Sequence, residues 1–459
     1  MNLTETEKQK IVSDMCRMIQ CKTVSNLDDS LVEWNEFEKF RALLKEIFPK
    51  IYSACEFYKV GKTGIVHKIW GTGIGSADGA SDTKHAVVLM AHYDVVPAEK
   101  EKWSFEPFAG DVVDGYIRGR GTMDTKGTLC ACLEAVEASL LSGWKPKHDL
   151  YLCFSGEEEI NGATCSEIVE WFKTNGISVD FVLDEGGAIV DNVFPGVDKR
   201  CAMIGTAEKG SVFMDVVVKG KSGHASAPPK CSAAGLVGKI VCQIEKAPCK
   251  AEFTAPVKQL FKIMGRNNKN PVLKFLLCNL WLTKPLLSFA SSALGGELNA
   301  MLHTTCAVTM LEGSSSYNVL PSKASAGINF RLLGSDTVEK AKARIEKIAR
   351  KAAGKKAEIS VNVVSANNPS IESDTDCWQW KSLCEVVHQT WPEILVSPYL
   401  MLACSDSRHY CAITDKVYRF SGMYMSKADR AMIHGIDEKI SIETLLKAVE
   451  FYKNLLDVL

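Results

Sequence analysis

The stretch His85–Asp94, HAVVLMAHYD, decides the predicted fold, because an apolar run ends abruptly in a histidine and an acid. Its first seven residues fit a strand that is buried on both faces and bounded by polar turns. Similar runs follow at Asp149–Ser155 and Val179–Leu183, and segments with helical spacing, Thr128–Ser142 and Thr164–Thr174, separate the three runs. Strands that alternate with helices predict parallel βαβ units with right-handed crossovers.

From about residue 210 the pattern changes to that of a second domain. The predicted order is strand, helix, strand, strand, helix, strand, which is the split βαβ plan of a small two-layer domain. These elements are Ser211–Lys219, Ala233–Glu245, Thr304–Glu312, Ala324–Leu332, Thr337–Ala353 and Ala357–Val364. We therefore expect an α/β fold: a discontinuous α/β domain, residues 1–208 and 366–459, interrupted by a ferredoxin-like α+β domain at residues 209–365.

Composition excludes several classes of protein. The chain of 459 residues has a formal net charge of −1, whereas domains held to nucleic acid or anionic lipid by counterion release normally carry a basic excess. An apolar content of 46% excludes a disordered or collagen-like chain.

The cysteines favour an intracellular protein. Their number is odd, at 17, the polar start MNLTETEKQK shows no secretory signal, and no pair has C-x2-C spacing. We expect a cytoplasmic protein whose cysteines pack as small apolar residues. Any metal would then be bound by His, Asp and Glu.

The longest apolar stretch, Asn270–Gly296, is interrupted by Lys274, Lys284 and Pro285. Its uncharged pieces fall short of the ~20 residues that a membrane span needs, so no membrane span is expected. The stretch predicts buried or interface helices, with a role at a membrane surface as the alternative.

Polar residues cluster where the predicted strands end, which is where open α/β sheets place their sites. Each motif alone has an ordinary explanation, such as a surface turn or a helix N-cap. Three adjacent carboxylates beside a buried strand are harder to explain without a cation, because they repel one another. The candidates are His92, Asp94, Asp124, Glu157, Glu158, Glu159, Asp184, Glu185 and His434. A mixed set of imidazoles and carboxylates suits Zn²⁺ or Co²⁺.

These motifs, in this order, resemble the dinuclear zinc amidohydrolases of peptidase family M20, which include aminoacylase-1, acetylornithine deacetylase and the Gly-X carboxypeptidases. The resemblance extends from about Asp14 to Leu456. It implies a zinc-exopeptidase-like catalytic domain with an inserted lid or dimerisation domain, a homodimer formed through that domain, and two divalent metal ions per chain, Zn²⁺ first, with Co²⁺ or Mn²⁺ possible.

The resemblance also implies roles for the strand-end residues. The metal ligands would be His92, Asp124, Glu159, Glu185 and His434, with Asp184 as the alternative to Glu185. Asp124 would bridge the two metals and precede a cis peptide bond, Asp94 would support His92, and Glu158 would be the general base. Glu157 replaces the usual Asp of the motif, which leaves the register open by one residue.

On the inserted domain, His224 of the GHAS loop would stabilise the oxyanion, often from the partner subunit. Arg408 in SDSR would bind the substrate carboxylate, Asn318 would contact the substrate, and Arg331 is a weaker candidate for such a contact.

The predicted function is metal-dependent hydrolysis of an amide next to a free carboxylate, of the Gly-X carboxypeptidase or N-acyl-amino-acid hydrolase type. The substrate would be a small peptide or an N-acyl amino acid, with no nucleic acid as partner. A dipeptidase or aminopeptidase with the same metal core is the alternative enzyme, and a non-catalytic binding protein is the other alternative. The apolar insertion would form an acyl pocket or a contact with a partner subunit.

Overall fold

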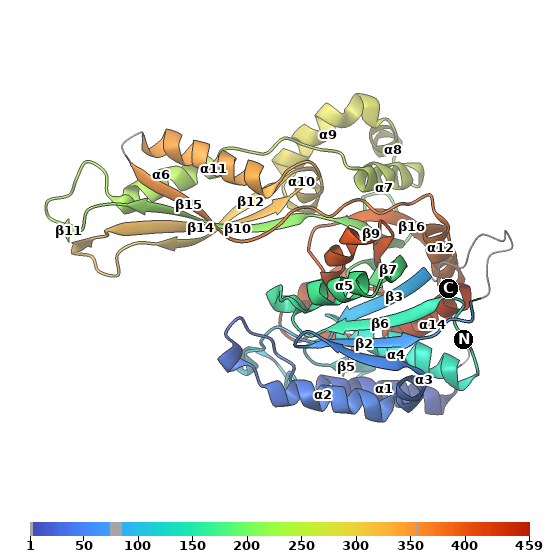
Figure 1. Ribbon diagram of the computed structural model, residues 1–459. Helices are drawn as coiled ribbons and strands as arrows, with labels where there is room; N and C mark the ends of the chain where they lie inside the picture. The colour runs from blue at the N-terminus through green and yellow to red at the C-terminus, as the bar shows by residue number, and fades with distance from the viewer. Residues whose placement is uncertain (1–2, 74–84, 355–356) are drawn as a thin grey trace. The chain divides into compact units, whose positions relative to one another are not determined.

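The computed structural model describes residues 3–73, 85–354 and 357–459 (Figure 1). These residues form two compact units. Unit 1 comprises Met1–Thr206, Ser373–Tyr399 and Ser405–Leu459, and unit 2 comprises Ala207–Glu372 and Leu400–Cys404. The mixed α/β fold class predicted from the sequence is confirmed, with unit 1 built from stretches that precede and follow most of unit 2 in the chain.

The main sheet has nine strands among the described residues, in the order β1-β2-β6-β3-β7-β17-β9-β16, with β8 paired to β9. Strand β3 lies parallel to β6 and β7, and β17 lies parallel to β7, as the βαβ prediction requires. The strands are β1 (Glu56–Val60), β2 (Gly64–Ile69), β3 (His85–His92), β6 (Asp149–Ser155), β7 (Ser178–Asp184), β8 (Ala188–Val190), β9 (Cys201–Glu208), β16 (Leu395–Met401) and β17 (Val417–Arg419). The parallel strands bring their polar carboxyl ends to one edge, where His92 lies opposite Ser155.

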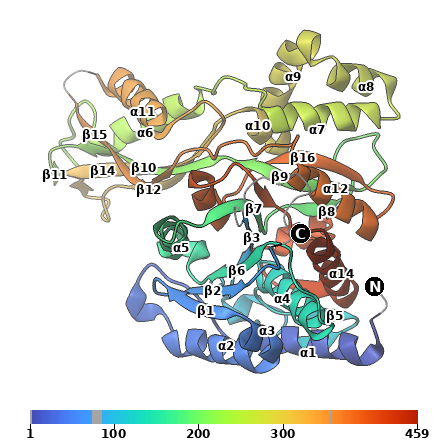
Figure 2. The same ribbon diagram turned by 45° about the vertical axis from the view of Figure 1, so that its right-hand side comes forward.

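Helices cover both faces of the central strands (Figures 1 and 2). Helix α5 (Thr164–Thr174) packs with Phe172 and Ile168 against one face, in a buried cluster with Val88 and Tyr151. Helix α4 (Lys126–Leu141) contacts β3 and lies against α14 (Ile442–Val458). Further helices of unit 1 are α1 (Glu5–Ile19), α2 (Trp34–Ile47), α3 (Pro49–Ala54), α12 (Trp378–Thr390) and α13 (Lys427–Met432).

Two of the cysteines lie in the buried helix α4. Cys130 and Cys132 are buried in it, and no disulfide joins the cysteines of the described chain. Burial raises the pKa of the Cys130 thiol well above its ordinary value, because the charged thiolate is poorly solvated there. Both thiols therefore pack as small apolar groups.

A small three-stranded sheet, which the sequence did not predict, joins distant segments of unit 1. It consists of β4 (Asp111–Val113), β5 (Tyr116–Arg118) and β18 (Lys439–Ser441), in the order β18-β5-β4. Arg118 pairs with Lys439. The residues that follow β5 are therefore held beside those that precede β18, and both stretches contribute to the site described below.

His67 on β2 predicts a measurable pH dependence of stability. It is fully buried between Tyr52 and Phe57, and its two ring nitrogens have no hydrogen-bond partner among the described residues. Burial lowers the pKa of His67 from 6.5 to about 4. Between these two values the unfolded chain binds the proton and the folded chain does not, so stability is lost as the pH falls through this window.

The variant His67→Phe is expected to lose less stability on acidification than the wild type, by roughly 2 kcal/mol between pH 7.5 and 5.0. Urea unfolding at the two pH values measures this difference. His388→Phe, at an exposed site on α12, is the control and should keep the wild-type pH dependence. An unchanged pH dependence in His67→Phe would contradict the assignment.

Unit 2 contains the predicted split βαβ domain. Its antiparallel sheet has the order β12-β14-β10-β15, and α6 and α11 cover one face through a shared apolar core that includes Ile240, Phe330 and Ile345. The elements are β10 (Gly210–Lys219), α6 (Ala233–Glu245), β12 (Thr305–Glu312), β14 (Lys323–Leu332), α11 (Val338–Ala353) and β15 (Glu358–Asn367). A short ribbon of β11 (Gly223–His224) and β13 (Val319–Leu320) completes it.

The apolar insertion of unit 2 forms helices α7 (Ala255–Arg266), α8 (Pro271–Cys278), α9 (Leu280–Leu294) and α10 (Gly296–Leu302). Of the predicted buried or interface helices, burial within the chain does not describe α8 and α9: α8 buries Leu277, and α9 buries Thr283, Leu287 and Ser291, while most of their apolar side chains face solvent. That they form an interface stays a prediction. No single described helix has the length and apolar composition to cross a membrane. The pair α8 and α9 meets that criterion only jointly, and its two helices are bent by 107°.

Candidate metal centre

Three predicted ligands from separate segments of unit 1 converge. His92 ends β3, Asp124 lies in the loop before α4, and Glu159 lies in the turn after β6. One ligand atom from each lies within 4.8 Å of the others. His92 Nε2 is 2.9 Å from Asp124 Oδ1. The spacing and the donor types are those of a divalent cation site.

His434 joins this cluster from the C-terminal part of unit 1. Its Nε2 lies 2.9 Å from Glu159 Oε2 and 3.1 Å from Asp124 Oδ2. Asp124 therefore has one carboxylate oxygen toward each imidazole, the arrangement that a carboxylate bridging two cations needs. The peptide bond between Asp124 and Thr125 is cis, as the resemblance implied.

Asp94 is fully buried behind the cluster and holds two of its parts. Its carboxylate accepts hydrogen bonds from the backbone N–H groups of Glu158 and Glu159 at 3.2 and 3.1 Å. His92 Nδ1 lies 3.0 Å from the Asp94 backbone oxygen and 3.4 Å from its Oδ1. These contacts fix the plane of the imidazole and direct Nε2 at Asp124. Ser25, which sequence reasoning missed, donates its hydroxyl to Asp94 at 2.7 Å.

The three glutamates after β6 have different surroundings. Glu158 Oε2 lies 4.0 Å from His92 Nε2, and Glu159 contacts His434. Glu157 instead accepts a hydrogen bond from the Thr164 hydroxyl. Only Glu158 and Glu159 therefore contact the two histidines, which favours the register assumed from the motif.

Burial raises the pKa of Glu158 well above its ordinary value. His92 opposes this effect, and the carboxylates of Asp406, Glu185 and Glu159 add to it. Glu158 thus lies in a buried, strongly acidic environment, where a group that takes up a proton is favoured.

The end of β7 offers two carboxylates. Asp184 is buried and accepts a hydrogen bond from the Ser407 backbone at 3.1 Å, whereas Glu185 is half-buried and close enough to raise the pKa of Glu158. Neither belongs to the cluster of His92, Asp124 and Glu159, so both stay as alternatives for a further ligand position.

The segment Ser405–Arg408 lies against Asp184. Asp406 accepts a hydrogen bond from the Ser155 hydroxyl, and burial raises its pKa to about 7. Arg408 donates from Nε to the backbone oxygen of Ser405 at 2.9 Å. The guanidinium is therefore held by its own segment, within the same unit as the cluster.

Sequence reasoning missed Glu438, which holds the Asp124 loop in place. Glu438 is fully buried and accepts hydrogen bonds from Arg120 Nη1 at 2.6 Å and from the backbone N–H groups of Met123 and Asp124 at 2.8 and 3.3 Å. Arg120 also donates to the backbone oxygen of Gly435 at 2.6 Å. One buried ion pair therefore positions both the Asp124 loop and the His434 segment.

Both imidazoles of the cluster favour protonation. Hydrogen bonds to Asp124 and then to Glu159 raise the pKa of His434 to about 10. Burial acts against protonation of His92, but its contacts with Asp124 and Asp94 outweigh burial and raise its pKa. The carboxylates thus stabilise positive charge at this site. A divalent cation could supply that charge in place of the two protons.

Metal binding is expected to release protons and to weaken as the pH falls, because both imidazoles must lose their protons to become ligands. For each proton released, the affinity for the metal should fall about tenfold when the pH is lowered by one unit. Calorimetric titration with Co²⁺ between pH 6 and 8, in buffers of different ionisation enthalpy, measures both effects. His434→Ala should bind more weakly and release fewer protons. An affinity that does not change with pH would contradict the assignment.

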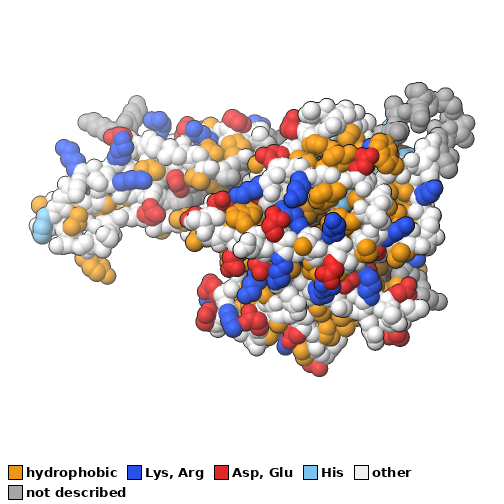
Figure 3. All heavy atoms as spheres, turned by 60° about the horizontal axis from the view of Figure 1, so that its bottom comes forward, with side chains coloured by type: hydrophobic (Ala, Val, Ile, Leu, Met, Phe, Trp, Pro, Cys, Tyr) orange, Lys and Arg blue, Asp and Glu red, His pale blue; other side chains and the backbone are white. Residues whose placement is uncertain are grey.

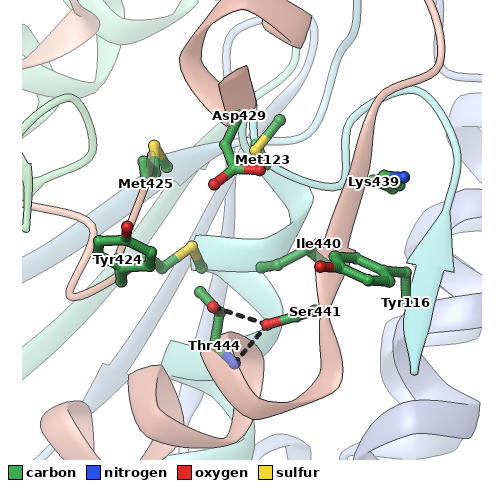
Figure 4. Close-up of a pocket in the computed structure, with 10 residues that line it drawn as sticks. Tyr116, Met123, Tyr424, Met425, Asp429, Lys439, Ile440, Ser441 and Thr444 are labelled. Carbon is green, nitrogen blue, oxygen red and sulfur yellow. Dashed lines mark hydrogen bonds between the residues drawn. The ribbon is translucent and has the colours of Figure 1, made fainter. Parts of the chain in front are cut away.

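A small cavity lies behind the Asp124 loop (Figure 4). Its volume is about 90 Å³, and its lining includes Met123, Tyr424 and Asp429. Ser441 caps α14 there by accepting a hydrogen bond from the Thr444 backbone at 3.0 Å. Ligand pockets usually enclose ~300 Å³ or more, so this cavity is not the substrate site.

Three predicted substrate contacts lie on unit 2. His224 on β11 and Asn318 beside β13 are neighbours, since the Ala225 backbone N–H donates to the Asn318 backbone oxygen at 3.0 Å. Arg331 is remote from them: it lies near the opposite end of β14, paired with Ser211, about 25 Å along the strand from Lys323. Arg331 Nη1 lies 3.5 Å from Cys404 Sγ.

The chain is similar to known proteins along nearly its whole length. The profile of Peptidase family M20/M25/M40 matches residues 88–458. A probable carboxypeptidase S-like 2 of Dictyostelium discoideum is 34% identical over 92% of this chain and 79% of its own. The N-fatty-acyl-amino acid synthase/hydrolase PM20D1 of Xenopus tropicalis is 31% identical over 99% of this chain and 86% of its own.

Solved structures share the fold. A metallo-carboxypeptidase of the M20 family from Sulfolobus solfataricus has a TM-score of 0.68 at 19% identity and covers 99% of both chains. A dinuclear metal binding peptidase of the M20 family from Bacillus subtilis has a TM-score of 0.58 at 13% identity, again over 99% of both chains. With the family profile over most of its length and relatives above 30% identity, the chain belongs to peptidase family M20/M25/M40 and is a metallo-peptidase or amidohydrolase of that family.

Proposed function

We propose that this enzyme hydrolyses an amide bond next to a free carboxylate, in N-acyl amino acids or at the C-terminus of small peptides. The observation that carries the proposal is the convergence of His92, Asp124, Glu159 and His434 with Glu158 beside them. Relatives named as carboxypeptidases and as N-fatty-acyl-amino acid hydrolases support this bond type, because substrates of both kinds present a carboxylate beside the amide.

Two divalent ions, preferably Zn²⁺ and otherwise Co²⁺ or Mn²⁺, fit the donor set. Asp124 would contribute one oxygen to each ion. Glu159 and His434 would hold one ion, and His92 the other, together with Glu185 or Asp184. When bound, such a pair acidifies water and polarises a carbonyl oxygen.

Glu158 would act as general base. Its carboxylate lies beside His92 and in a buried site, and it would take a proton from the attacking water and return it to the leaving amine. Asp94 would hold the Glu158 backbone and the His92 ring in the geometry that this transfer needs.

His224 would stabilise the oxyanion of the tetrahedral intermediate. Its Nδ1 accepts a hydrogen bond from the Ser226 backbone at 3.1 Å, so the proton of the neutral ring is on Nε2, which is then a donor. The side chain is exposed on the β11–β13 ribbon and accessible to a substrate.

Arg408 would bind the substrate carboxylate, because a guanidinium matches a carboxylate in a two-point hydrogen bond. Its Nε donates a hydrogen bond to the Ser405 backbone oxygen, and this bond restricts the side chain. Asn318 is a second candidate contact because it lies beside His224, whereas Arg331, at the other end of β14, is the weaker one.

The test is a substrate panel on the enzyme after chelation and reloading with Zn²⁺, Co²⁺ or Mn²⁺. N-acetyl and N-oleoyl amino acids and N-blocked dipeptides should be cleaved, and their C-terminal amides should not. Cleavage that requires a free N-terminus and tolerates a blocked C-terminus would identify an aminopeptidase instead. Absence of turnover with every metal would favour a binding protein.

A homodimer formed through unit 2 is part of the proposal. The edge strand β12 exposes Met310 and Leu311, which a partner could cover. If His224 acts on the partner's substrate, mixing inactive Glu158→Gln and His224→Ala chains should restore activity, since a mixed dimer has one complete site. No restored activity after subunit exchange would place His224 in its own chain's site.

A further inference from the structure

Helix α9 of unit 2 buries two hydroxyl side chains and exposes most of its large apolar side chains. Thr283, Leu287 and Ser291, at spacings of four, form its buried face. Trp281 and Phe289 lie away from this buried face, and their side chains are 81% and 74% exposed. Further exposed apolar residues of α9 are Leu282, Leu286 and Leu294.

A hydrogen bond from Thr283 to the neighbouring helix fixes this orientation. Thr283 donates to the Leu276 backbone oxygen of α8 at 2.6 Å, whereas Ser291 donates within α9, to the Ser288 oxygen at 2.9 Å. Rotating α9 to bury its aromatic residues would break the Thr283 contact with α8. The hydrogen bond of Thr283 therefore keeps the apolar face of α9 exposed.

Helix α8 adds to this surface, and α7 packs against α8 (Figures 1 and 2). On α8, Val272 and Phe275 are exposed. We call the exposed residues Val272, Phe275, Trp281, Leu282, Leu286 and Phe289 the α8–α9 apolar surface. An exposed apolar surface of this kind marks a site of interaction.

Along the sequence of these helices, the charged side chains are all cationic. Between Glu252 and Glu297 the chain has six cations and no Asp or Glu. The cations are Lys258, Lys262, Arg266, Lys269, Lys274 and Lys284. Three of them, Lys258, Lys262 and Arg266, are exposed at helical spacing along α7. Elsewhere, on the face drawn in Figure 3, cationic and anionic side chains are intermixed.

We propose that the α8–α9 apolar surface and the α7 cations dock this enzyme on the surface of an anionic phospholipid bilayer. Exposed Trp, Phe and Leu side chains insert at the headgroup boundary, while Lys and Arg pair with anionic headgroups. Helices of 8 and 15 residues, bent by 107°, would lie in the interface plane.

The charge pattern favours a bilayer over a second copy of the chain as the occupant. A two-fold symmetric contact centred on this surface would bring the same cations of both copies into one contact, where like charges repel. No acidic residue between 253 and 296 is present to offset them. Anionic headgroups supply the opposite charge.

The experiment uses the full chain and large unilamellar vesicles in co-sedimentation. Vesicles of phosphatidylcholine with 30% phosphatidylserine should bind the enzyme at least tenfold more strongly than pure phosphatidylcholine at low salt. Raising the salt to 0.5 M should remove most of the difference, because it screens the cations. Equal binding to both lipids, or none, overturns the proposal.

Two variants separate the contributions. Trp281→Ser/Phe289→Ser and Lys258→Ala/Lys262→Ala/Arg266→Ala should each lower binding at least tenfold. The matched controls are Leu27→Ser/Leu31→Ser, an exposed apolar pair of unit 1, and Lys340→Ala/Lys347→Ala/Lys351→Ala on α11, and both should bind like the wild type. Circular dichroism checks the fold of each, and if the serine variant does not fold, the lysine variant decides.

Quenching by brominated lipid reports the depth of Trp281, and the part of the quenching due to this residue should be absent in Trp281→Phe. Sedimentation velocity tests the competing occupant. If Trp281→Ser/Phe289→Ser dissociates an oligomer and vesicle binding is unchanged, the surface is a protein contact and the proposal is wrong.

Discussion

Replacing Glu158 by Gln is expected to lower kcat by about 10²–10⁴-fold, because the amide cannot accept the proton of the attacking water. The metal content should not change, since Glu158 does not belong to the cluster of His92, Asp124 and Glu159. Steady-state kinetics on an N-acyl amino acid, together with elemental analysis of metal, measures both quantities.

Glu157→Gln is the matched control, because Glu157 is engaged by Thr164 rather than by a histidine. It should retain turnover within a few-fold of the wild type. If Glu157→Gln is the inactive variant and Glu158→Gln is active, the register of the motif must be moved by one residue. If both are active, the general-base proposal is wrong.

Replacing Glu438 by Ala is expected to lower the free energy of unfolding of unit 1 by about 3–5 kcal/mol, because it leaves the Arg120 guanidinium buried without its carboxylate. It also removes the acceptor of the Met123 and Asp124 backbone N–H groups. Metal affinity should therefore fall together with stability, although Glu438 is not a predicted ligand. Urea unfolding followed by circular dichroism and a metal titration test the two effects.

The double variant Arg120→Met/Glu438→Leu separates the ion pair from the loop contacts. It removes both buried charges, so it should be more stable than Glu438→Ala while still binding metal poorly. Asp437→Asn, at a half-buried neighbour that accepts a hydrogen bond from the Ser104 backbone, should change stability little, because the amide oxygen of Asn can still accept that bond. A stable Glu438→Ala with normal metal affinity would contradict the role assigned to this residue.

The sequence predicted the parallel strands and the edge where their polar residues meet. That prediction succeeded because buried parallel strands are continuous apolar runs, and the residue after each run must lie at the carboxyl edge of the sheet. The convergence of His92, Asp124 and Glu159 follows from this topology together with the motif order.

The supports of the site could not be predicted in the same way. Glu438 contacts Arg120 across more than three hundred residues, and no local periodicity indicates such a partner. Ser25 contacts Asp94 from a loop before α2, which carries no motif. Pairings of this kind depend on the tertiary fold and not on local sequence.

Whether the insertion is buried or forms an interface could not be decided from the sequence, for a different reason. Apolar composition predicts burial in a soluble domain, but α9 turns Thr283 and Ser291 inward and Trp281 outward. A net charge of −1 likewise averages over the chain and conceals the cations of α7. Averages over composition and charge do not show which side of a helix faces the solvent.

The ion pair of Arg120 and Glu438 has a consequence for biosynthesis. During translation, the Asp124 loop leaves the ribosome long before His434 and Glu438 have been polymerised. Until then the loop lacks the carboxylate that orders it, and the cluster lacks its second imidazole. We expect the nascent chain to be a poor metal ligand and the metal to be acquired only after residue 438 has emerged.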